Sequence, residues 1–328
     1  MKRQKLAAWF AGVFVTCAAA SALYAADAKF PVRPVRILIP YAPGGATDNT
    51  ARLLSNKLTE MWGQQIIIDN RPGGSGIIAM DLAVNATPDG YTLFVGNVST
   101  NAINETALAK TMRYKPSKAL TGVTNLIELP HFFLVNPTVP VSTIKELFAY
   151  AKTHKIAYAS SGVASYPHLD VARLLRAGGV TGTHVPYKGG AGQMIPAIIS
   201  NEVQLMELNM GSILPHIRSG KVKPLATTWP TRLKELPNVP TMAESGYPGI
   251  GTNAWNGLFA PAKISKPMLN RIFNDVVKAM EAPDMKVALE KQYMSVVVNK
   301  SPAEFQKFVE NDVKKWAKVL QENDIKIE

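Results

Sequence analysis

The chain has 328 residues, of which 47% are apolar and 18% are charged. This composition predicts a folded protein with a buried core and excludes a disordered chain. Lysine and arginine outnumber aspartate and glutamate by 36 − 24 = 12, but the basic residues are scattered, so we expect an anion-attracting surface and no nucleic-acid partner. The single cysteine, Cys17, excludes a disulfide framework and the common cysteine-rich zinc sites.

Residues 1–26 have the layout of a secretory signal peptide. A cationic head (residues 1–5) precedes an apolar stretch (residues 6–20), and a run of small residues ends at Ala26. A retained membrane anchor is the alternative, because the apolar stretch approaches the length that spans a bilayer. We expect cleavage near Ala25 or Ala26, export to the periplasm, and a mature chain without cysteine.

Apolar runs that end in glycine or proline alternate with amphipathic stretches in the first part of the mature chain. The runs at residues 35–39, 65–68 and 91–95 predict buried strands. Between the first two, apolar side chains recur at helical spacing up to Trp62, and Gly63 marks the end of that helix. This alternation predicts an α/β protein with mostly parallel sheets.

A second unit begins near Leu129. A capping box of Thr143 and Glu146 opens a helix that runs to about His154. Apolar runs predict its strands at residues 132–135, 156–159, 203–206 and 224–227.

The last part of the chain predicts a return path and two helices. Residues 229–251 are rich in proline and glycine and indicate an extended connection. An apolar run follows at residues 258–261, and then two amphipathic helices, the second opened by a capping box of Ser301 and Glu304.

Residues 43–48 join an expected strand to the start of a helix through a glycine pair. Glycine lets a ligand approach the backbone closely, and the first N–H groups of a helix attract an anion. The alternative is a tight turn in which Thr47 or Asp48 merely caps the helix. Residues 73–76 have the same character, and neither segment matches a P-loop or a dinucleotide fingerprint.

Ser160 and Ser161 follow another expected strand, with Ser165 and His168 close behind. Hydroxyl and N–H groups at the carboxyl end of a strand suit a carboxylate. A hydrolase with a serine nucleophile and His168 as its base is the alternative, although the Gly-x-Ser-x-Gly elbow is absent and Asp170 lies too near in sequence for a typical triad. His168 can instead orient a loop of the site, or be purely structural.

A third glycine turn, residues 184–190, offers the hydroxyl of Tyr187 and the cation of Lys188. The alternative is a surface turn with a solvated lysine. Histidine and acidic residues show no spacing typical of metal ligands, so we expect neither a metal nor a cofactor. Three glycine turns without a nucleophile favour binding over catalysis.

The same segments resemble the substrate-binding proteins of tripartite tricarboxylate transporters, the Bug family. The similarity covers essentially the whole mature chain, in the family's order. Its motifs are residues 31–35, 43–48, 70–74, 88–93, 158–162, 168–169, 184–189, 236–241, 243–246 and 255–261.

The resemblance implies a two-lobed periplasmic binding protein of the type II-like α/β fold. Each lobe is expected to be a mainly parallel sheet flanked by helices, with two crossover strands between the lobes. Residues 27–128 and 255–328 are expected in lobe 1, and residues 129–254 in lobe 2. The lobes of such a monomer close on an organic carboxylate and present it to the permease subunits in the membrane.

The resemblance also implies which residues bind the ligand. In this family a carboxylate is typically held by backbone amides, hydroxyls and ordered waters from the loop after the first strand and from the Tyr-Lys-Gly segment. Carried onto this chain, the ligand-binding residues are Pro43, Gly44, Gly45, Ala46, Thr47, Asp48, Ser99, Thr100, Ser160, Ser161, Gly162, Ser165, His168, Tyr187, Lys188, Gly189, Gly190, Ala191 and Asn209.

Three departures from the family pattern concern the ligand. Leu208 stands where relatives commonly have aspartate, Tyr166 and Pro167 replace a small polar pair, and residues 130–133 are bulkier than usual. The missing acid disfavours an amino-acid ligand, and the aromatic surface favours a flat carboxylate such as terephthalate, an aromatic dicarboxylate. A ligand-sensing subunit that signals to another protein is the alternative function, since it would use the same lobes.

Overall fold

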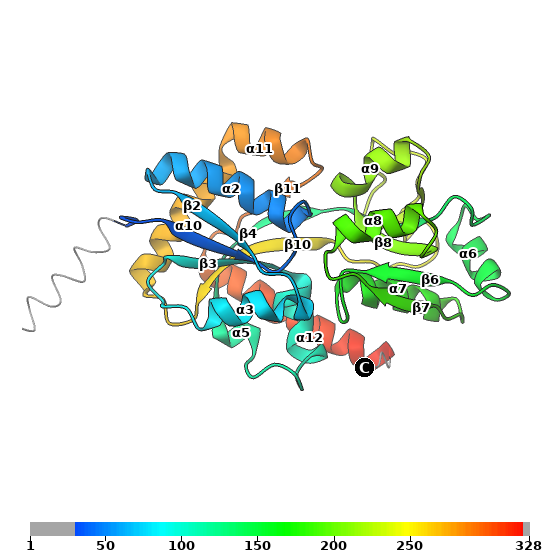
Figure 1. Cartoon of the computed structure of the whole chain (residues 1–328), viewed down its shortest axis with the longest axis horizontal. Coiled ribbons are helices and arrows are strands. Elements are labelled where there is room, and N and C mark those ends of the chain that lie inside the picture. The colour runs from blue at the N-terminus through cyan, green and yellow to red at the C-terminus, as the bar shows by residue number, and fades with distance from the viewer. Residues whose placement is uncertain (1–29, 324–328) are drawn as a thin grey trace, which may run out of the picture.

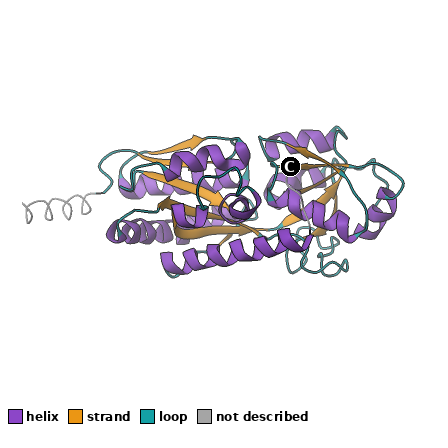
Figure 2. Ribbon diagram, turned by 90° about the horizontal axis from the view of Figure 1, so that it is seen from below, coloured by secondary structure: helices purple, strands orange, loops and turns teal. Residues whose placement is uncertain are grey.

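The computed structural model describes residues 30–323, which form two lobes, each built on one β-sheet (Figure 1). Seen from below, the strands of each lobe lie between helices (Figure 2). The predicted signal peptide and Cys17 lie outside the described residues. Within residues 30–323, no helix combines the length and the apolar character needed to cross a membrane. The two-lobed α/β class predicted from the sequence is confirmed.

The sheet of lobe 1 has the strand order β11-β4-β10-β3-β1-β2. Its strands are β1 (Val35–Ile39), β2 (Ile66–Asn70), β3 (Thr92–Asn97), β4 (Leu120–Leu129), β10 (Ala254–Pro261) and β11 (Ser295–Val296). The apolar side chains of β1 are buried, and β1 pairs in parallel with both β2 and β3. The carboxyl ends of these three strands therefore meet at one edge of the sheet, which faces lobe 2 (Figure 1).

Helices cover both faces of the lobe 1 sheet. They are α2 (Ala46–Trp62), α3 (Ile77–Val84), α4 (Asn104–Ala107), α5 (Pro116–Ala119), α10 (Lys266–Glu281), α11 (Pro283–Glu290) and α12 (Pro302–Asn323), with the short turns η1 (Gly74–Gly76) and η2 (Ser99–Ile103). Figure 1 shows α2, α10 and α11 over one face, and α3, α5 and α12 over the other. The buried stripe of α2 includes Leu54 and Leu58, and Gly63 ends the helix in the left-handed conformation, as predicted.

The sheet of lobe 2 has the strand order β7-β6-β8-β5-β9. Its elements are β5 (His131–Val135), β6 (Ala157–Ser160), β7 (Thr183–Pro186), β8 (Leu205–Asn209), β9 (Lys223–Thr227), α6 (Ile144–Ala151), α7 (Tyr166–Ala177), α8 (Ala191–Ile199) and α9 (Met210–Arg218). Two apolar clusters pack on its faces, one from α6 and α7 and one from α8 and α9. This lobe therefore presents the N-termini of α7, α8 and α9 near the carboxyl ends of its strands.

Both sheets are mixed, which corrects the prediction of mainly parallel sheets. β10 runs antiparallel to β3 and β4, and β5 runs antiparallel to β8 and β9. Apolar runs report burial but not strand direction, so the sequence pattern could not distinguish these strands from the parallel ones. β4 carries the chain toward lobe 2 and β10 carries it back, and this return makes the two strands antiparallel.

The segments that join the lobes lie side by side. β4 continues through Pro130 into β5, and the return path leads through Thr252 into β10. Ala254 is in register with Leu129, and the Thr228 hydroxyl donates to the Thr252 carbonyl at 3.2 Å. The division of the chain at residues 129 and 255 stays a prediction.

Two helix starts follow the predicted capping boxes. The hydroxyls of Thr143 and Ser301 each accept the N–H of the glutamate three residues on, at 3.1 and 3.2 Å. α11 and β11 lie between the two predicted C-terminal helices and were not predicted.

Candidate ligand-binding site

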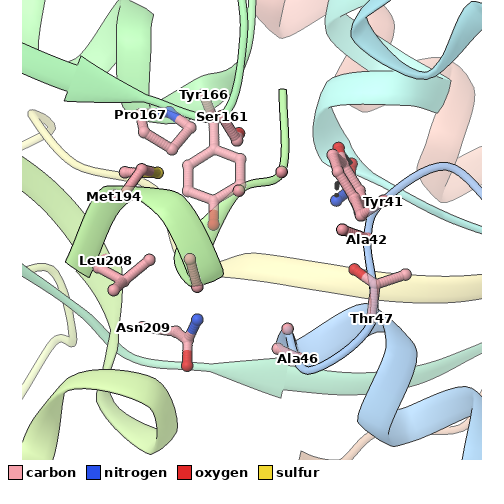
Figure 3. Close-up of a pocket in the computed structure, with 15 residues that line it drawn as sticks. Tyr41, Ala42, Ala46, Thr47, Ser161, Tyr166, Pro167, Met194, Leu208 and Asn209 are labelled. Carbon is pink, nitrogen blue, oxygen red and sulfur yellow. Dashed lines mark hydrogen bonds between the residues drawn. The ribbon is translucent and has the colours of Figure 1, made fainter. Parts of the chain in front are cut away.

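A cavity of about 530 Å³, its open mouth included, lies between the two lobes. Figure 3 shows residues of the two lobes on facing sides, with the ring of Tyr166 projecting into the space between them. The lining residues of this main cavity are Tyr41, Ala42, Gly45, Ala46, Thr47 and Asn97 from lobe 1, and Ser161, Tyr166, Pro167, Gly189, Gly190, Ala191, Met194, Leu208 and Asn209 from lobe 2. None of these side chains carries a formal charge.

The N-terminus of α2 forms much of the lobe 1 wall. Its N-cap residue is Gly45, which offers no side chain to the helix, so the predicted alternative of a cap by Thr47 or Asp48 is wrong. Asn49 is the first residue whose N–H bonds into the helix, to the Gly45 carbonyl at 2.9 Å. The N–H groups of residues 46–48 have no hydrogen-bond partner within the described part of the chain, and such groups attract an anion.

Asp48 holds the loop that precedes α2. Its carboxylate accepts the Gly44 N–H, the Arg52 side chain and the Asn70 amide, each at 2.9 Å. Burial alone raises the pKa of Asp48, but these hydrogen bonds and the charge of Arg52 together lower it below its ordinary value. Asp48 is therefore an ionised, fully bonded group that shapes the wall and does not line the main cavity.

The N-terminus of α8 forms the matching part of the lobe 2 wall. Its N-cap is Gly190, again without a side-chain cap, with φ +63° and ψ −139°. The N–H groups of Gln193 and Met194 both bond to the Gly190 carbonyl at 3.0 Å. The N–H groups of Ala191 and Gly192 have no hydrogen-bond partner within residues 30–323. A second set of free donors therefore adjoins the main cavity.

An apolar surface completes the lobe 2 wall. Tyr166, Pro167, Met194 and Leu208 contribute it, with Tyr166 and Pro167 in the first turn of α7. The Tyr166 hydroxyl lies 2.6 Å from Nε2 of His131, whose Nδ1 lies 3.2 Å from the Leu129 carbonyl. Burial lowers the pKa of His131 to about 3, so the neutral ring donates through Nδ1–H and accepts the Tyr166 O–H. This bond fixes the orientation of the Tyr166 ring in the cavity.

Two asparagines add polar groups to the lining. Asn209 caps α9, accepting the Ser212 N–H at 2.9 Å through Oδ1. Its Nδ2 has no partner among residues 30–323 and points into the cavity (Figure 3). Asn97 bonds to the Tyr41 hydroxyl and accepts the Ser99 and Thr100 N–H groups. The cavity is thus lined by amide, hydroxyl and backbone donors.

Ser160 and His168 lie behind the wall, in a cluster with His184. The Ser160 hydroxyl lies 2.6 Å from Nε2 of His184, and the rings of His168 and His184 stack with centroids 3.8 Å apart. Nδ1 of His168 accepts the Ala164 N–H at 3.2 Å. Ser160 is fully buried and bonded to a histidine other than the one expected as its base, so this geometry does not support the hydrolase alternative.

Direct contacts join the lobes on one side of the cavity. The Tyr166 N–H donates to the Ser99 hydroxyl at 3.0 Å, and the Ser75 hydroxyl donates to the Val163 carbonyl at 2.8 Å. Ala164 packs with the lobe 1 core. The two lobes therefore contact each other at the rim of the cavity.

The structure divides the residues predicted for the ligand into three groups. Eight line the main cavity: Gly45, Ala46, Thr47, Ser161, Gly189, Gly190, Ala191 and Asn209. Two line a neighbouring cavity: Gly162 and Lys188. The remainder line neither: Pro43, Gly44, Asp48, Ser99, Thr100, Ser160, Ser165, His168 and Tyr187.

Four lining residues were outside the prediction altogether: Tyr41, Ala42, Asn97 and Met194. Tyr41 and Ala42 directly precede a predicted glycine turn, so their position was the available signal. Asn97 ends β3 beside β1 and could have been found from the same strand-end rule. Phe132 and His131 are fully buried and do not line the cavity, so of the expected aromatic residues Tyr166 lines it, and the ring of Tyr41 in lobe 1 joins it there.

No three His, Cys, Asp or Glu side chains among residues 30–323 lie together as metal ligands would. The two sheets, the paired connections and a cavity between the lobes define a two-lobed solute-binding protein. The model of the family described as "Tripartite tricarboxylate transporter family receptor" matches residues 50–325, and the chain belongs to this family.

Solved structures agree with this assignment. The periplasmic binding protein BugD is 28% identical, with a TM-score of 0.84 over 90% of this chain and 99% of that one. MatC from Rhodopseudomonas palustris with bound malate is 31% identical, with a TM-score of 0.83 over 89% of this chain and 100% of that one. A protein of R. palustris with adipate is 31% identical, with a TM-score of 0.84 over 90% and 99%.

Proposed function

We propose that this chain is a periplasmic solute-binding protein that captures an organic carboxylate in the main cavity and delivers it to a tripartite tricarboxylate-type permease. One observation carries the proposal: the uncapped N-termini of α2 and α8, from different lobes, both open on a cavity without an acidic side chain. Free helix N–H groups stabilise a carboxylate by charge-assisted hydrogen bonds. A carboxylate held by both helices would keep the lobes together.

The apolar surface supports a ligand with a flat, apolar body. Tyr166, Pro167 and Leu208 provide a face on which an aromatic ring can stack and pack. Leu208 stands where an acid would be needed to pair with the ammonium group of an amino acid. We therefore place aromatic carboxylates, with terephthalate as the example, ahead of amino acids.

Titration calorimetry with terephthalate, benzoate, adipate, malate, citrate and glutamate tests the proposal. At least one organic acid should bind with a dissociation constant in the micromolar range or below, and glutamate should bind more weakly. The same acids should raise the melting temperature as their concentration rises, because binding adds about 2.7 kcal/mol to the free energy of unfolding at a hundredfold excess over Kd. Absence of heat with every acid would refute the proposed function, and a response to glutamate alone would refute the aromatic preference.

A matched pair of variants locates the binding. Ala46→Leu places a larger side chain at the first residue of α2, where Ala46 lines the main cavity. Ala303→Leu makes the same change in the first turn of α12, where Ala303 is exposed. Binding should fall by about tenfold or more in the first variant and stay unchanged in the second. Equal binding by both variants would place the ligand elsewhere.

Delivery is tested in cells that carry the permease. Uptake of the labelled acid should depend on this chain and should fall with Ala46→Leu as binding does. Uptake that persists without the chain would contradict the delivery role.

A further inference from the structure

A second cavity, of about 500 Å³ with its opening, adjoins the main cavity. The two share Tyr41 and Ser161 as lining residues, so they are neighbouring chambers that meet at these two side chains. The lining residues of this second cavity are Pro40, Tyr41, Gly73, Gly74, Ser75, Gly76, Ser161, Gly162, Val163, Pro186 and Lys188. Like the main cavity, it draws on both lobes.

Ser161 marks the junction between the two chambers. Its side chain is half-buried and makes no hydrogen bond within the described part of the chain. Tyr41, the other shared residue, has its hydroxyl engaged by Asn97. The junction therefore offers an unused hydroxyl donor to a molecule that passes from one chamber to the other.

Charge distinguishes the second chamber from the first. Lys188 is the charged residue among all those that line either chamber; like Lys221 it is an exposed lysine, and it forms no ion pair with residues 30–323. On the lobe 1 side, the loop of residues 73–76 contains no acidic residue. The N–H groups of Gly74 and Ser75 in this loop have no hydrogen-bond partner within the described residues. An anionic group in this chamber would thus meet a free cation from lobe 2 and free backbone donors from lobe 1.

We propose that the second cavity is a subsite for the far end of the ligand, in which Lys188 selects a second carboxylate. This inference rests on the proposed function, because it presumes that a first carboxylate occupies the main cavity. The ligand body passes Ser161, and its second carboxylate lies between Lys188 and the loop of Gly74. Since these groups come from different lobes, the second carboxylate ties the lobes together at a second point.

Matched pairs of acids separate the two chambers. Adipate is compared with hexanoate, and terephthalate with 4-methylbenzoate, because each pair differs in one terminal carboxylate. In calorimetry the dicarboxylate of the pair that binds should be favoured by about tenfold or more. Lys188→Met should weaken dicarboxylate binding by about tenfold and leave the monocarboxylate within about twofold, whereas Lys188→Arg should keep the preference.

Lys221→Met is the matched control, because Lys221 is an exposed lysine of lobe 2 that lines neither chamber. It removes the same charge and should leave all affinities unchanged. A preference for dicarboxylates that survives Lys188→Met, or that falls equally in Lys221→Met, overturns the subsite. Monocarboxylates that bind as tightly as their partners overturn it too, while the proposed function stands. If no acid binds at all, the proposed function and this inference fall together.

Discussion

The two walls of the main cavity can be compared element by element. Each wall includes a helix N-terminus opened by a glycine, Gly45 of α2 in lobe 1 and Gly190 of α8 in lobe 2. The lobe 1 wall adds mainly polar groups, whereas the lobe 2 wall adds the side chains of Tyr166, Met194 and Leu208. The two walls thus share a glycine-opened helix N-terminus, which suits a carboxylate. They differ in their side chains, and the apolar side chains of the lobe 2 wall are the ones that can select the rest of the ligand.

The buried acids behind the two walls differ as well. Asp48 in lobe 1 is bonded by three donors, and its pKa is lowered. In lobe 2, Glu207 on β8 and Asp170 on α7 are fully buried, and three of their four carboxyl oxygens have no hydrogen-bond partner among the described residues. Burial and the charge of Asp170 raise the pKa of Glu207. Asp48 behind the lobe 1 wall is thus ionised and fully hydrogen-bonded, whereas burial favours the protonated form of Glu207 in lobe 2.

The largest effect is expected from Asp48→Asn. The variant keeps the shape but loses the charge and one of the acceptors that hold Gly44, Arg52 and Asn70, so the free energy of unfolding should fall by about 2 kcal/mol. Because folding lowers the pKa of Asp48, this stabilisation is present above the unfolded pKa of about 4 and is lost as the pH falls from there through the lower pKa of the folded state. Denaturant unfolding at pH 7 and at a series of lower pH values down to about pH 2 measures both effects.

Asp69→Asn is the control for this prediction. Asp69 is a partly exposed acid of β2 that pairs with Arg71 at 2.7 Å, and a surface pair contributes about 1 kcal/mol or less. Equal losses in the two variants would show that the bonds of Asp48 are ordinary surface interactions, and the contrast between the lobes would then rest on lobe 2 alone.

Gly190→Ala compared with Gly45→Ala tests whether the two helix starts are alike. A Cβ at either position would meet no atom within 4 Å, so only the backbone differs. Gly190 has φ +63° with ψ −139°, a conformation that only glycine adopts easily, while Gly45 is extended. Gly190→Ala should cost about 1–3 kcal/mol of stability, and Gly45→Ala at most about 0.5 kcal/mol. Thermal unfolding measures the loss of stability in each variant. Equal losses would show that an alanine at position 190 is not strained by the backbone conformation of the α8 turn.

The buried acid of lobe 2 predicts an unusual pH dependence. Its raised pKa means that the unfolded chain loses this proton near pH 4.5 while the folded chain keeps it, so the contribution of Glu207 to stability is lost as the pH rises. Glu207→Gln removes this dependence and, like the protonated carboxyl, carries no charge, so it should match the parent near pH 4. By pH 7 it should be more stable by about 1 kcal/mol or more.

Glu290→Gln is the exposed counterpart of Glu207→Gln and should show no such trend. Both variants are compared with the parent by denaturant unfolding between pH 4 and pH 8. A variant Glu207→Gln that loses stability as the pH rises would show that Glu207 is ionised in the folded protein, and the contrast with Asp48 would disappear.

Local sequence predicted the strands and glycine turns well. β1 has the bounds predicted from its apolar run, and Gly63 ends α2 as predicted, because burial and left-handed turns leave local signals. The same signals placed Gly45, Ser161 and Gly190 at strand ends or helix starts, where the cavity lies.

The parts that the sequence could not predict depend on distant partners. The sequence predicts Asp48 as a ligand residue or a helix cap, but one of the three donors that hold its carboxylate is Asn70 on β2, which is distant in sequence. Tyr166 departs from the family pattern, but the direction of its ring depends on His131, which lies 35 residues away on β5. Strand direction likewise needs the pairing partner, which an apolar run does not name.

Tyr166 offers the finest test of the lobe 2 wall. Tyr166→Phe removes the hydroxyl that bonds to His131 and leaves a buried ring nitrogen unpaired, so stability should fall by about 1 kcal/mol. The ring remains, and carboxylate affinity should stay within about threefold of the parent. Tyr166→Ala removes the ring as well, and the affinity for an aromatic acid should then fall by about tenfold.

These two variants separate the role of the Tyr166 hydroxyl, which bonds to His131, from the role of its ring. Calorimetry with terephthalate compares their affinities at a temperature at which both variants are folded. If Tyr166→Phe weakens binding as much as Tyr166→Ala does, the hydroxyl contacts the ligand and the bond to His131 is broken in the loaded protein. If neither variant weakens binding, the ligand rests on the polar lobe 1 wall, and the apolar surface of lobe 2 plays no part in choosing it.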